Sequence, residues 1–289
     1  MTGRRARRRD VLASLTAWAL AGTLGWTGRS RAAAGARVAI VGGGFGGATA
    51  ARYLRRLAPG IAVTLFEPRR TYLTCPHSNA VIGGLAEFGS LRRGYASLRD
   101  RDGVDVRHER VLAIDAARRE VVTRAGRSGW DRLVVAPGIR LRWGAPEGYD
   151  EAAALRMPHA WKAGAQTLLL RRQLEALPAG GVIAITVPPR PFRCPPGPYE
   201  RASLVARWCR AHRPRAKVLV LDANADFSKQ ALFLEAWQAL YPGLIEWVPI
   251  DRDGAVRRVD PGAMTVHTEL EDHRVDVANV IPAQGAAAL

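Results

Sequence analysis

A glycine-rich turn followed by an acidic residue is the pattern in this sequence that indicates ligand chemistry most directly. Residues 37–41 form an apolar run that leads into Gly42-Gly43-Gly44-Phe45-Gly46-Gly47, and Glu67 lies twenty residues beyond the last of these glycines. Gly42 permits a tight turn, Gly44 lets the backbone approach a pyrophosphate, and Gly47 lets a helix pack closely on a strand. Glu67 can accept hydrogen bonds from ribose hydroxyls. The pattern predicts a dinucleotide site; FAD, NAD and NADP stay open, although an acidic Glu67 disfavours the 2′-phosphate of NADP.

Cys75 lies about thirty residues past the glycine turn, in the segment 72–81. A cysteine at this distance lies where a flavin would sit, and its thiolate can tether the cofactor. Pro76 and the short polar residues around it are consistent with an irregular loop wrapped around a ligand. The alternative is a buried free thiol, which is the common state of a lone cysteine.

Cys194 and Cys209 are the other two cysteines of the chain. Cys194 lies in the proline-rich segment 187–196, at the place where a second βαβ unit would carry its phosphate-binding glycines. Because proline has no N–H group, that segment offers few donors to a nicotinamide pyrophosphate. Cys209 follows Val205 by one helical turn and is expected in the core. The sequence contains neither the haem-attachment pattern Cys-x-x-Cys-His nor a Cys/His cluster with zinc spacing, so we predict no metal site.

Two motifs carry a resemblance to a known family. They are Tyr72-x-Thr74-Cys75 and the run Cys194-Pro-Pro-Gly-Pro-Tyr-Glu200-Arg201. With them, the chain from about 37 to about 284 resembles the flavoprotein subunit of flavocytochrome c sulfide dehydrogenase. The resemblance implies an α/β fold of two Rossmann-like domains. It also implies an enzyme that oxidises sulfide through FAD, with electrons passing to a c-type cytochrome subunit.

The resemblance also implies roles for individual residues. Cys75 would carry the 8α-methyl group of FAD through a thioether. Cys194 would be one half of a redox-active disulfide, and Glu200 would be the acid/base of the site. The other candidate cofactor-binding residues come from the glycine turn, the cysteine loop and a second glycine turn: Gly42, Gly43, Gly44, Phe45, Gly47, Glu67, Asn79 and Gly138.

Several alternatives stay open beside this interpretation. Glu200 is equally compatible with a helix-terminal acid stabilised by the helix dipole. A sulfide:quinone oxidoreductase would share the fold and the disulfide. The sequence offers no partner for Cys194 downstream other than Cys209, and it ends before the C-terminal domain that the family implies. We therefore also consider a truncated, inactive flavin-binding fragment.

The first 34 residues are typical of an export signal. They hold seven arginines and one aspartate, a twin-arginine pattern at Arg8-Arg9-Asp10-Val11-Leu12, an uncharged run over 11–28 and an A-x-A site at 32–34. We expect twin-arginine export to the periplasm and, after cleavage, no membrane span. An uncleaved membrane helix is the alternative, although this run is at the short limit for a bilayer.

The formal net charge of +17 does not by itself indicate nucleic-acid binding. Part of it lies in the first 34 residues, and the rest is scattered among apolar segments with no basic helix interleaved with aromatic residues. An acidic protein partner or simple solubility explains this charge as well.

The periodicity of the chain predicts two βαβ units, at about 37–67 and about 182–222. Strands are expected at 61–66, 104–108, 111–115, 119–124, 182–187, 217–221, 245–249, 255–259 and 263–268, and helices at 46–57, 166–176, 199–212 and 228–241. We expect the segments 104–108, 111–115 and 119–124 to form one small meander. The predicted organisation is a signal at 1–34, an FAD domain at 36–150, a nicotinamide-domain-like unit at 155–275, and a truncated return to the FAD domain at 276–289.

Overall fold

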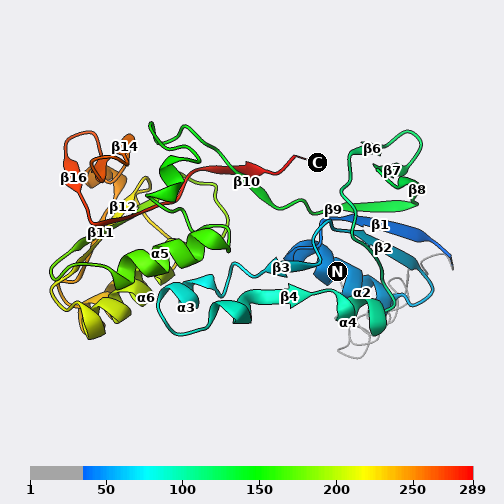
Figure 1. Ribbon diagram of the computed structural model, residues 1–289, viewed down its shortest axis with the longest axis horizontal. Helices are drawn as coiled ribbons and strands as arrows, with labels where there is room; N and C mark the ends of the chain where they lie inside the picture. Colours follow the sequence, from blue (N-terminus) through cyan, green and yellow to red (C-terminus); the bar gives the residue numbers. More distant parts are fainter. Residues whose placement is uncertain (1–34, 289) are drawn as a thin grey trace, which may run out of the picture.

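The computed structural model describes residues 35–288, which form two α/β lobes joined by a narrower waist (Figure 1). Each lobe is built on a four-stranded parallel sheet. This confirms the predicted fold class of two Rossmann-like units. The predicted signal segment lies outside the described residues. Among the helices within 35–288, none combines the length and the apolar content that a bilayer span requires.

The sheet of the first lobe has the strand order β5-β2-β1-β9, and every neighbouring pair in it is parallel. The central strand β1 buries four of its five residues, and α2 packs on it through Gly47 and Ala51. The small side chains of that helix face allow the close approach that the glycine pattern predicts. The elements are β1 (Arg37–Val41), α2 (Phe45–Leu57), β2 (Ala62–Phe66), α4 (Ala96–Asp100), β5 (Asp105–Arg107) and β9 (Arg132–Val135).

The expected meander differs from the structure at both ends. The segment 104–108 supplies β5, which pairs in parallel with β2, because Val104 is buried in the same core as Val63 and Leu65. The third strand of the meander is instead β8, a Gly-Arg-Ser-Gly run without an apolar pattern, which the periodicity does not reveal. The meander consists of β6 (Ala113–Asp115), β7 (Glu120–Thr123) and β8 (Gly126–Gly129), paired antiparallel.

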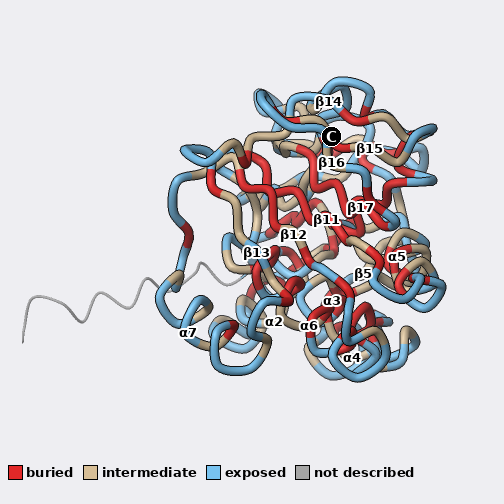
Figure 2. Tube along the Cα trace, turned by 90° about the vertical axis from the view of Figure 1, so that its left-hand side faces the viewer, coloured by how far each residue is buried: buried red, intermediate tan, exposed pale blue. Residues whose placement is uncertain are grey.

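The sheet of the second lobe has the order β13-β12-β11-β17, and the lobe is layered on both faces of it (Figure 2). Ile183 and Ile185 of β11 point into a core with the three helices, whereas Val182 and Ala184 point toward the other face, as the two-residue period of a strand requires. The elements are η2 (Ala153–Leu155), α5 (Ala165–Glu175), β11 (Val182–Val187), α6 (Gly197–His212), β12 (Lys217–Asp222), α7 (Gln230–Leu240), β13 (Ile245–Val248), η3 (Ile250–Arg252) and β17 (Val277–Val280).

The far face of this second sheet is covered by residues 149–157 and by a small antiparallel sheet. That sheet consists of β14 (Arg258–Asp260), β15 (Thr265–His267) and β16 (Asp272–Arg274). Tyr149 and Met157 are fully buried there, so the core of the second lobe begins within the predicted FAD domain of 36–150.

The C-terminal segment differs from the prediction that 276–289 returns to the first lobe. β17 pairs in parallel with β11, because all four of its residues are buried between the two layers of the second lobe. Only the last strand, β18 (Gln284–Ala286), leaves that sheet. It pairs antiparallel with β10 (Ile139–Leu141) in the waist.

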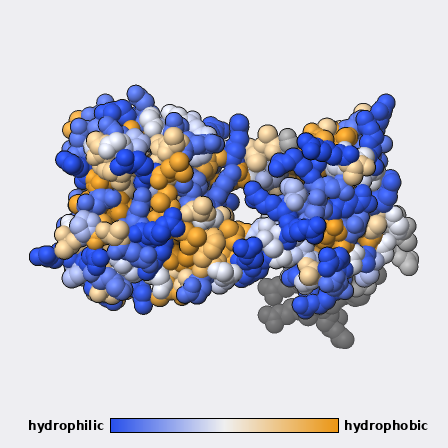
Figure 3. All heavy atoms as spheres, viewed as in Figure 1, coloured by the Kyte–Doolittle hydropathy of each residue, from blue (hydrophilic) through white to orange (hydrophobic). Residues whose placement is uncertain are grey.

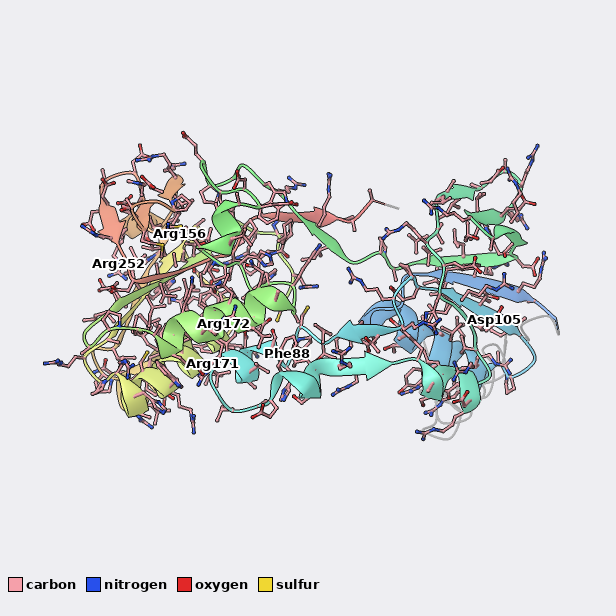
Figure 4. All side chains as sticks on the ribbon, in the orientation of Figure 1. Phe88, Asp105, Arg156, Arg171, Arg172 and Arg252 are labelled. Atoms are coloured by element: carbon pink, nitrogen blue, oxygen red, sulfur yellow. The ribbon has the colours of Figure 1, made fainter. Side chains whose placement is uncertain are left out.

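A second strand pair also crosses the waist. It consists of β3 (Thr71–Leu73) and β4 (Arg92–Gly94), and the chain between them carries α3 (Ser78–Ile82) and η1 (Phe88–Leu91) (Figure 1). α3 packs against α5 and α6 of the second lobe. Arg171 extends from α5 toward this segment (Figure 4), and its Nη1 donates to Ile82 O at 3.1 Å. The waist therefore places the residues that follow Cys75 on the second lobe.

Candidate functional site

The glycine turn of the first lobe is closely packed at two positions and open at a third. Gly42 has φ +98, and a Cβ there would lie 2.2 Å from Ala136 O; a Cβ at Gly47 would lie 1.8 Å from Gly42 O. Any side chain would therefore clash with the backbone at either position, and both positions require glycine. At Gly44, by contrast, a Cβ would meet nothing within 4 Å. The open space therefore lies at the residue whose backbone was predicted to approach a pyrophosphate.

The N-terminus of α2 is left without a protein cap. Gly44 is its N-cap, no side chain caps it, and its first turn contains no acidic residue. A helix end of this kind presents free N–H groups and positive potential, which is the environment that phosphate oxygens prefer. Phe45, at the start of α2, is half exposed.

Glu67 closes the far side of this turn. Its Oε2 accepts from Gly43 N at 2.9 Å and its Oε1 from Arg69 N at 3.0 Å. Tyr95 donates its hydroxyl to Gly43 O at 3.0 Å, and burial, with the nearby Glu67 carboxylate, raises the pKa of Tyr95, so the donor stays protonated. The carboxylate is thereby fixed beside the turn, with lone pairs left for ribose hydroxyls.

A cavity of about 350 Å³ lies next to this turn, at the start of α2. The space-filling view shows the surface hollowed between the two lobes (Figure 3). Thr74, the residue before Cys75, is buried in its wall, and the Thr74 hydroxyl has no hydrogen-bond partner. A buried hydroxyl without a partner costs free energy unless a ligand or water satisfies it. The cavity is lined by Phe45, Tyr72, Thr74, Pro76, His77 and Arg93.

The residues around the glycine turn and the cavity fit a flavin dinucleotide. The open Gly44 and the uncapped helix suit a pyrophosphate, Glu67 suits a ribose, and the Thr74 hydroxyl and Arg93 offer donors in the cavity beyond. Gly138, in the turn between β9 and β10, has φ +80 and open space at its Cβ position. These residues would hold the FAD.

The structure brings the Cys75 loop to the second lobe. Ser78 fixes the loop by donating its hydroxyl to Cys75 O at 2.6 Å, and Cys75 Sγ accepts from Ala163 N at 3.4 Å. Lys162, beside that N–H, has its pKa lowered by burial and by the neighbouring Arg193 and Arg69.

Asn79 links the two cysteine loops. Its Nδ2 donates to Glu200 Oε2 at 2.7 Å and to Gly197 O at 3.2 Å, and its Oδ1 accepts from Arg201 Nε at 2.9 Å. Asn79 was expected to contact the cofactor. Both of its polar atoms are engaged within the protein, and a cofactor contact stays a prediction.

Cys194 lies in the turn that leads into α6, with φ +58. The residue is exposed and its thiol is free. Its sulfur lies against the helix start, where a Cβ added at Gly197 would be 3.2 Å away. Desolvation of the thiol, followed by the Glu200 carboxylate, raises the pKa of Cys194. The structure thus places both predicted catalytic residues at the N-terminal end of α6.

Two further positions behave as structural residues. Cys209 is fully buried in α6, and burial raises its pKa to about 11, which suits a core thiol. Asp222, at the end of β12, accepts from Tyr199 Oη at 2.6 Å, Trp247 Nε1 at 3.0 Å and Asn224 Nδ2 at 2.8 Å. Its carboxylate is occupied within the second lobe and is not offered to a ribose.

Three residues of the site were given no role from the sequence: Arg201 and Thr74, which were named only as members of motifs, and Tyr95. Their burial is what makes them important, and burial follows from packing between distant segments. Within residues 35–288, no group of three or more His, Cys, Asp or Glu side chains is arranged to hold a metal ion.

The chain is similar to known protein families that agree with this geometry and that define the class of protein. Residues 36–165 match the pyridine nucleotide-disulphide oxidoreductase family, so the first lobe is that of an FAD-binding flavoprotein oxidoreductase. Residues 167–282 match the central region of the sulfide dehydrogenase [flavocytochrome c] flavoprotein chain. The flavoprotein chain from Chlorobaculum thiosulfatiphilum is 64% identical over 45 residues, which are 16% of this chain and 94% of that sequence. The chain belongs to the family of flavocytochrome c sulfide dehydrogenase flavoprotein chains.

More distant relatives share the fold. A sulfide-quinone reductase from Aquifex aeolicus is 31% identical over 115 residues, 39% of this chain and 26% of the relative. The solved sulfide:quinone oxidoreductase of Aquifex aeolicus superposes with a TM-score of 0.70 at 21% identity, over 86% of this chain and 58% of that one. A water-forming NADH oxidase from Lactobacillus brevis superposes with a TM-score of 0.60 at 17% identity, over 86% and 53%. The chain spans a little over half the length of these solved structures.

Proposed function

We propose that this chain carries FAD, bound covalently through Cys75, and oxidises sulfide for a c-type cytochrome partner. The observation that carries the proposal is the Asn79–Glu200 hydrogen bond of 2.7 Å. It joins the loop of the proposed flavin tether to the helix that starts beside Cys194. The tether, the thiol and the carboxylate therefore meet at one place between the lobes.

Cys194 and Glu200 would do the chemistry of this site. Hydrosulfide adds its sulfur to Cys194, forming a persulfide anion and releasing two protons and an electron pair: Cys–SH and HS⁻ give Cys–S–S⁻, 2 H⁺ and 2 e⁻. When bound, FAD supplies the acceptor for that electron pair and can pass it on one electron at a time. Glu200 would take up one of the protons and deliver it to solvent, since Glu200 is exposed.

The structure of the second lobe argues against a pyridine-nucleotide substrate. The turn after β11 contains Pro188, Pro189, Pro191, Pro195 and Pro196, none of which has an N–H group to offer to a phosphate. The position that would cradle a nicotinamide pyrophosphate instead carries Cys194. The redox partner would then be sulfide and not NADH.

A stopped-flow comparison tests the proposal. Sulfide should bleach the flavin absorbance of the purified protein and then support reduction of cytochrome c, whereas NADH should do neither. A protein that reduces a short-chain quinone but not cytochrome c would be a sulfide:quinone oxidoreductase, which the likeness to the Aquifex aeolicus proteins makes the second candidate. Flavin reduction by NADH in preference to sulfide would contradict both assignments.

The proposal includes a periplasmic location and a c-type cytochrome partner. Export by the twin-arginine route would put the folded, FAD-loaded chain in the periplasm, where a c-type cytochrome can meet it. Cell fractionation of the native host would test this, with protein retained in the cytoplasm as the contrary outcome. Co-purification of a haem-containing chain would test the partner.

A further inference from the structure

Arg201 carries the most deeply buried guanidinium among the described residues, and no carboxylate contacts it directly. Arg201 is 2% exposed. Its nitrogens donate to four neutral oxygens: Asn79 Oδ1 at 2.9 Å, His159 O at 3.1 Å, Asn279 Oδ1 at 2.9 Å and Ala160 O at 2.8 Å. Its guanidinium carbon also lies 5.2 Å from the ring centre of Trp161. A buried cation without an ion-pair partner is costly, so its retention calls for a function.

The nearest carboxylate is reached through one side-chain amide. A guanidinium only donates hydrogen bonds, so the Asn79 oxygen must face Arg201 and the Asn79 nitrogen must face away from it. That nitrogen donates to Glu200 Oε2 at 2.7 Å. The orientation of Asn79 is therefore set by Arg201, and the position of Glu200 is set by Asn79.

The same guanidinium ties together the segments that form the site. Asn79 belongs to α3, which follows the Cys75 loop. His159 and Ala160 lie just before Ala163, whose N–H contacts Cys75 Sγ at 3.4 Å. Arg201 itself belongs to the first turns of α6, which starts three residues after Cys194. Burial lowers the pKa of Arg201 to about 10, so the side chain is still a cation at neutral pH.

We propose that Arg201 and Asn79 are positioning residues: Arg201 orients Asn79, Asn79 holds the Glu200 carboxylate beside Cys194, and the Arg201 cation offsets the negative charge of Glu200 at the thiol. This inference rests on the proposed function of Cys194 and Glu200. It adds an electrostatic balance to that site. The charged groups that face the thiol are Arg193 on its own loop, and Glu200 and Arg201 on α6. Glu200 disfavours the thiolate, whereas the two arginines favour it.

The two members of the pair have opposite predicted effects on the thiol. Removing the cation in Arg201→Gln takes away a stabiliser of the thiolate, so Cys194 should be alkylated about fivefold more slowly at neutral pH. Arg201→Lys keeps the charge and should recover most of the rate. Asn79→Ala releases Glu200, whose carboxylate then moves into water where its field is weaker, so alkylation should become about twofold faster.

Asn279 provides a matched control. Like Asn79, it is buried and accepts from Arg201 through its Oδ1 at 2.9 Å, but its Nδ2 donates to the carbonyls of Pro158 and His159 and not to a carboxylate. Asn279→Ala should therefore lower stability as Asn79→Ala does, while leaving the pH profile of Cys194 alkylation unchanged. A purely structural role for the network predicts the same alkylation profile for both variants.

The experiment measures iodoacetamide labelling of Cys194 against pH by peptide mass, in purified FAD-loaded protein that has been reduced beforehand. Support requires slower labelling in Arg201→Gln, recovery in Arg201→Lys, and faster labelling in Asn79→Ala than in Asn279→Ala. Identical profiles for the two asparagine variants would overturn the proposal, and that comparison decides the matter even where the arginine variants fail to fold. Sulfide reduction of the flavin is recorded in parallel. Loss of that activity with the labelling order intact would count against the proposed function alone.

Discussion

The two βαβ turns of this molecule share a topology and differ in what they offer to a ligand. In the first lobe, β1 leads into Gly42–Gly47 and an uncapped helix, and the backbone at Gly44 is open. In the second lobe, β11 leads into a proline-rich turn, with Pro196 as the N-cap of α6 and Pro198 in its first turn. A parallel strand followed by a helix builds the same crevice in both lobes. Only the residues of the turn decide whether that crevice binds phosphate.

The difference shows how one fold unit can acquire a new role. Replacing glycine by proline removes backbone donors and stiffens the turn, and the turn then holds a cysteine in a left-handed conformation, φ +58. The helix start that would have met a phosphate carries Glu200 in its first turn, which would repel one. The second turn is thus suited to present a thiol to the flavin of the first lobe.

The strongest test of this division of roles is Cys75→Ser. If the first lobe alone holds the flavin and Cys75 tethers it, the variant should lose all covalent flavin while keeping its fold. Denatured wild-type protein should retain yellow colour and flavin fluorescence on a gel, and the variant should retain none. Cys209→Ser, at a buried core thiol, serves as the control and should keep the covalent flavin. Flavin that stays attached to denatured Cys75→Ser would refute the tether.

The next largest effect is expected from Gly44→Val. A Cβ at this position meets no protein atom within 4 Å, so we expect the fold to tolerate the side chain, which fills the space assigned to the pyrophosphate. We expect FAD affinity to fall about a hundredfold, because phosphate oxygens can no longer reach the N–H groups of α2. Fluorescence titration of the Cys75→Ser background measures this directly. Gly60→Ala, also open but at a distant turn, is the control; equal affinities in the two variants would place the dinucleotide elsewhere.

The sequence could predict the first lobe better than the second, for physical reasons. The glycine turn obeys local rules of backbone space, so Gly42, Gly47 and Glu67 were recognised from spacing alone. The structure gives the two glycines the close packing that the pattern requires and places Glu67 beside the turn. The strands with long apolar runs were recognised for the same reason. The short strand β8 was missed because glycine, arginine and serine carry no burial signal.

The polar network of the second lobe could not be predicted. Asn79 and Arg201 are separated by more than a hundred residues, and their contact depends on α3 crossing the waist to reach α6. The motif that contains Arg201 does not show that its guanidinium is buried, because that burial depends on packing between distant segments. The place of β17 was missed similarly: an apolar run suits any buried strand, and its sheet is chosen by the long-range pairing with β11.

In the second lobe, the stability of the fold is expected to depend on pH through His159. His159 is buried beside Arg201, and its Nδ1 accepts from Trp161 N at 2.9 Å, which requires a neutral ring. Burial, then the positive charges of Arg201 and Lys162, lower its pKa from 6.5 to about 4. As the pH falls below 6.5, the unfolded chain takes up this proton before the folded one does. The stability that neutral His159 allows is therefore complete above pH 6.5 and is lost as the pH falls toward 4.

We expect this single group to lower the free energy of unfolding by about 2 kcal/mol between pH 8 and pH 5. His159→Gln keeps an acceptor but does not titrate, so its free energy of unfolding should fall by about 2 kcal/mol less than that of the wild type over the same pH range. Urea unfolding at a series of pH values measures both. Parallel curves for the two proteins would mean that His159 binds its proton equally in the folded and unfolded states.

The smallest expected effect concerns Thr74, whose buried hydroxyl lacks a partner at the cavity of the first lobe. Thr74→Val keeps the shape and removes the hydroxyl. Without FAD, the variant should be more stable than wild type by about 1 kcal/mol, because an unsatisfied polar group has been removed. The affinity of the variant for FAD should be about tenfold weaker than that of the wild type, because a donor to the cofactor is lost.

Thr123→Val is the control. That buried hydroxyl already donates to Glu109 Oε2 at 2.6 Å, so its loss should destabilise the protein without changing FAD affinity. Opposite signs for stability and affinity at Thr74 would identify a hydroxyl kept for its ligand. A loss of stability with unchanged affinity would instead place Thr74 among the ordinary core residues.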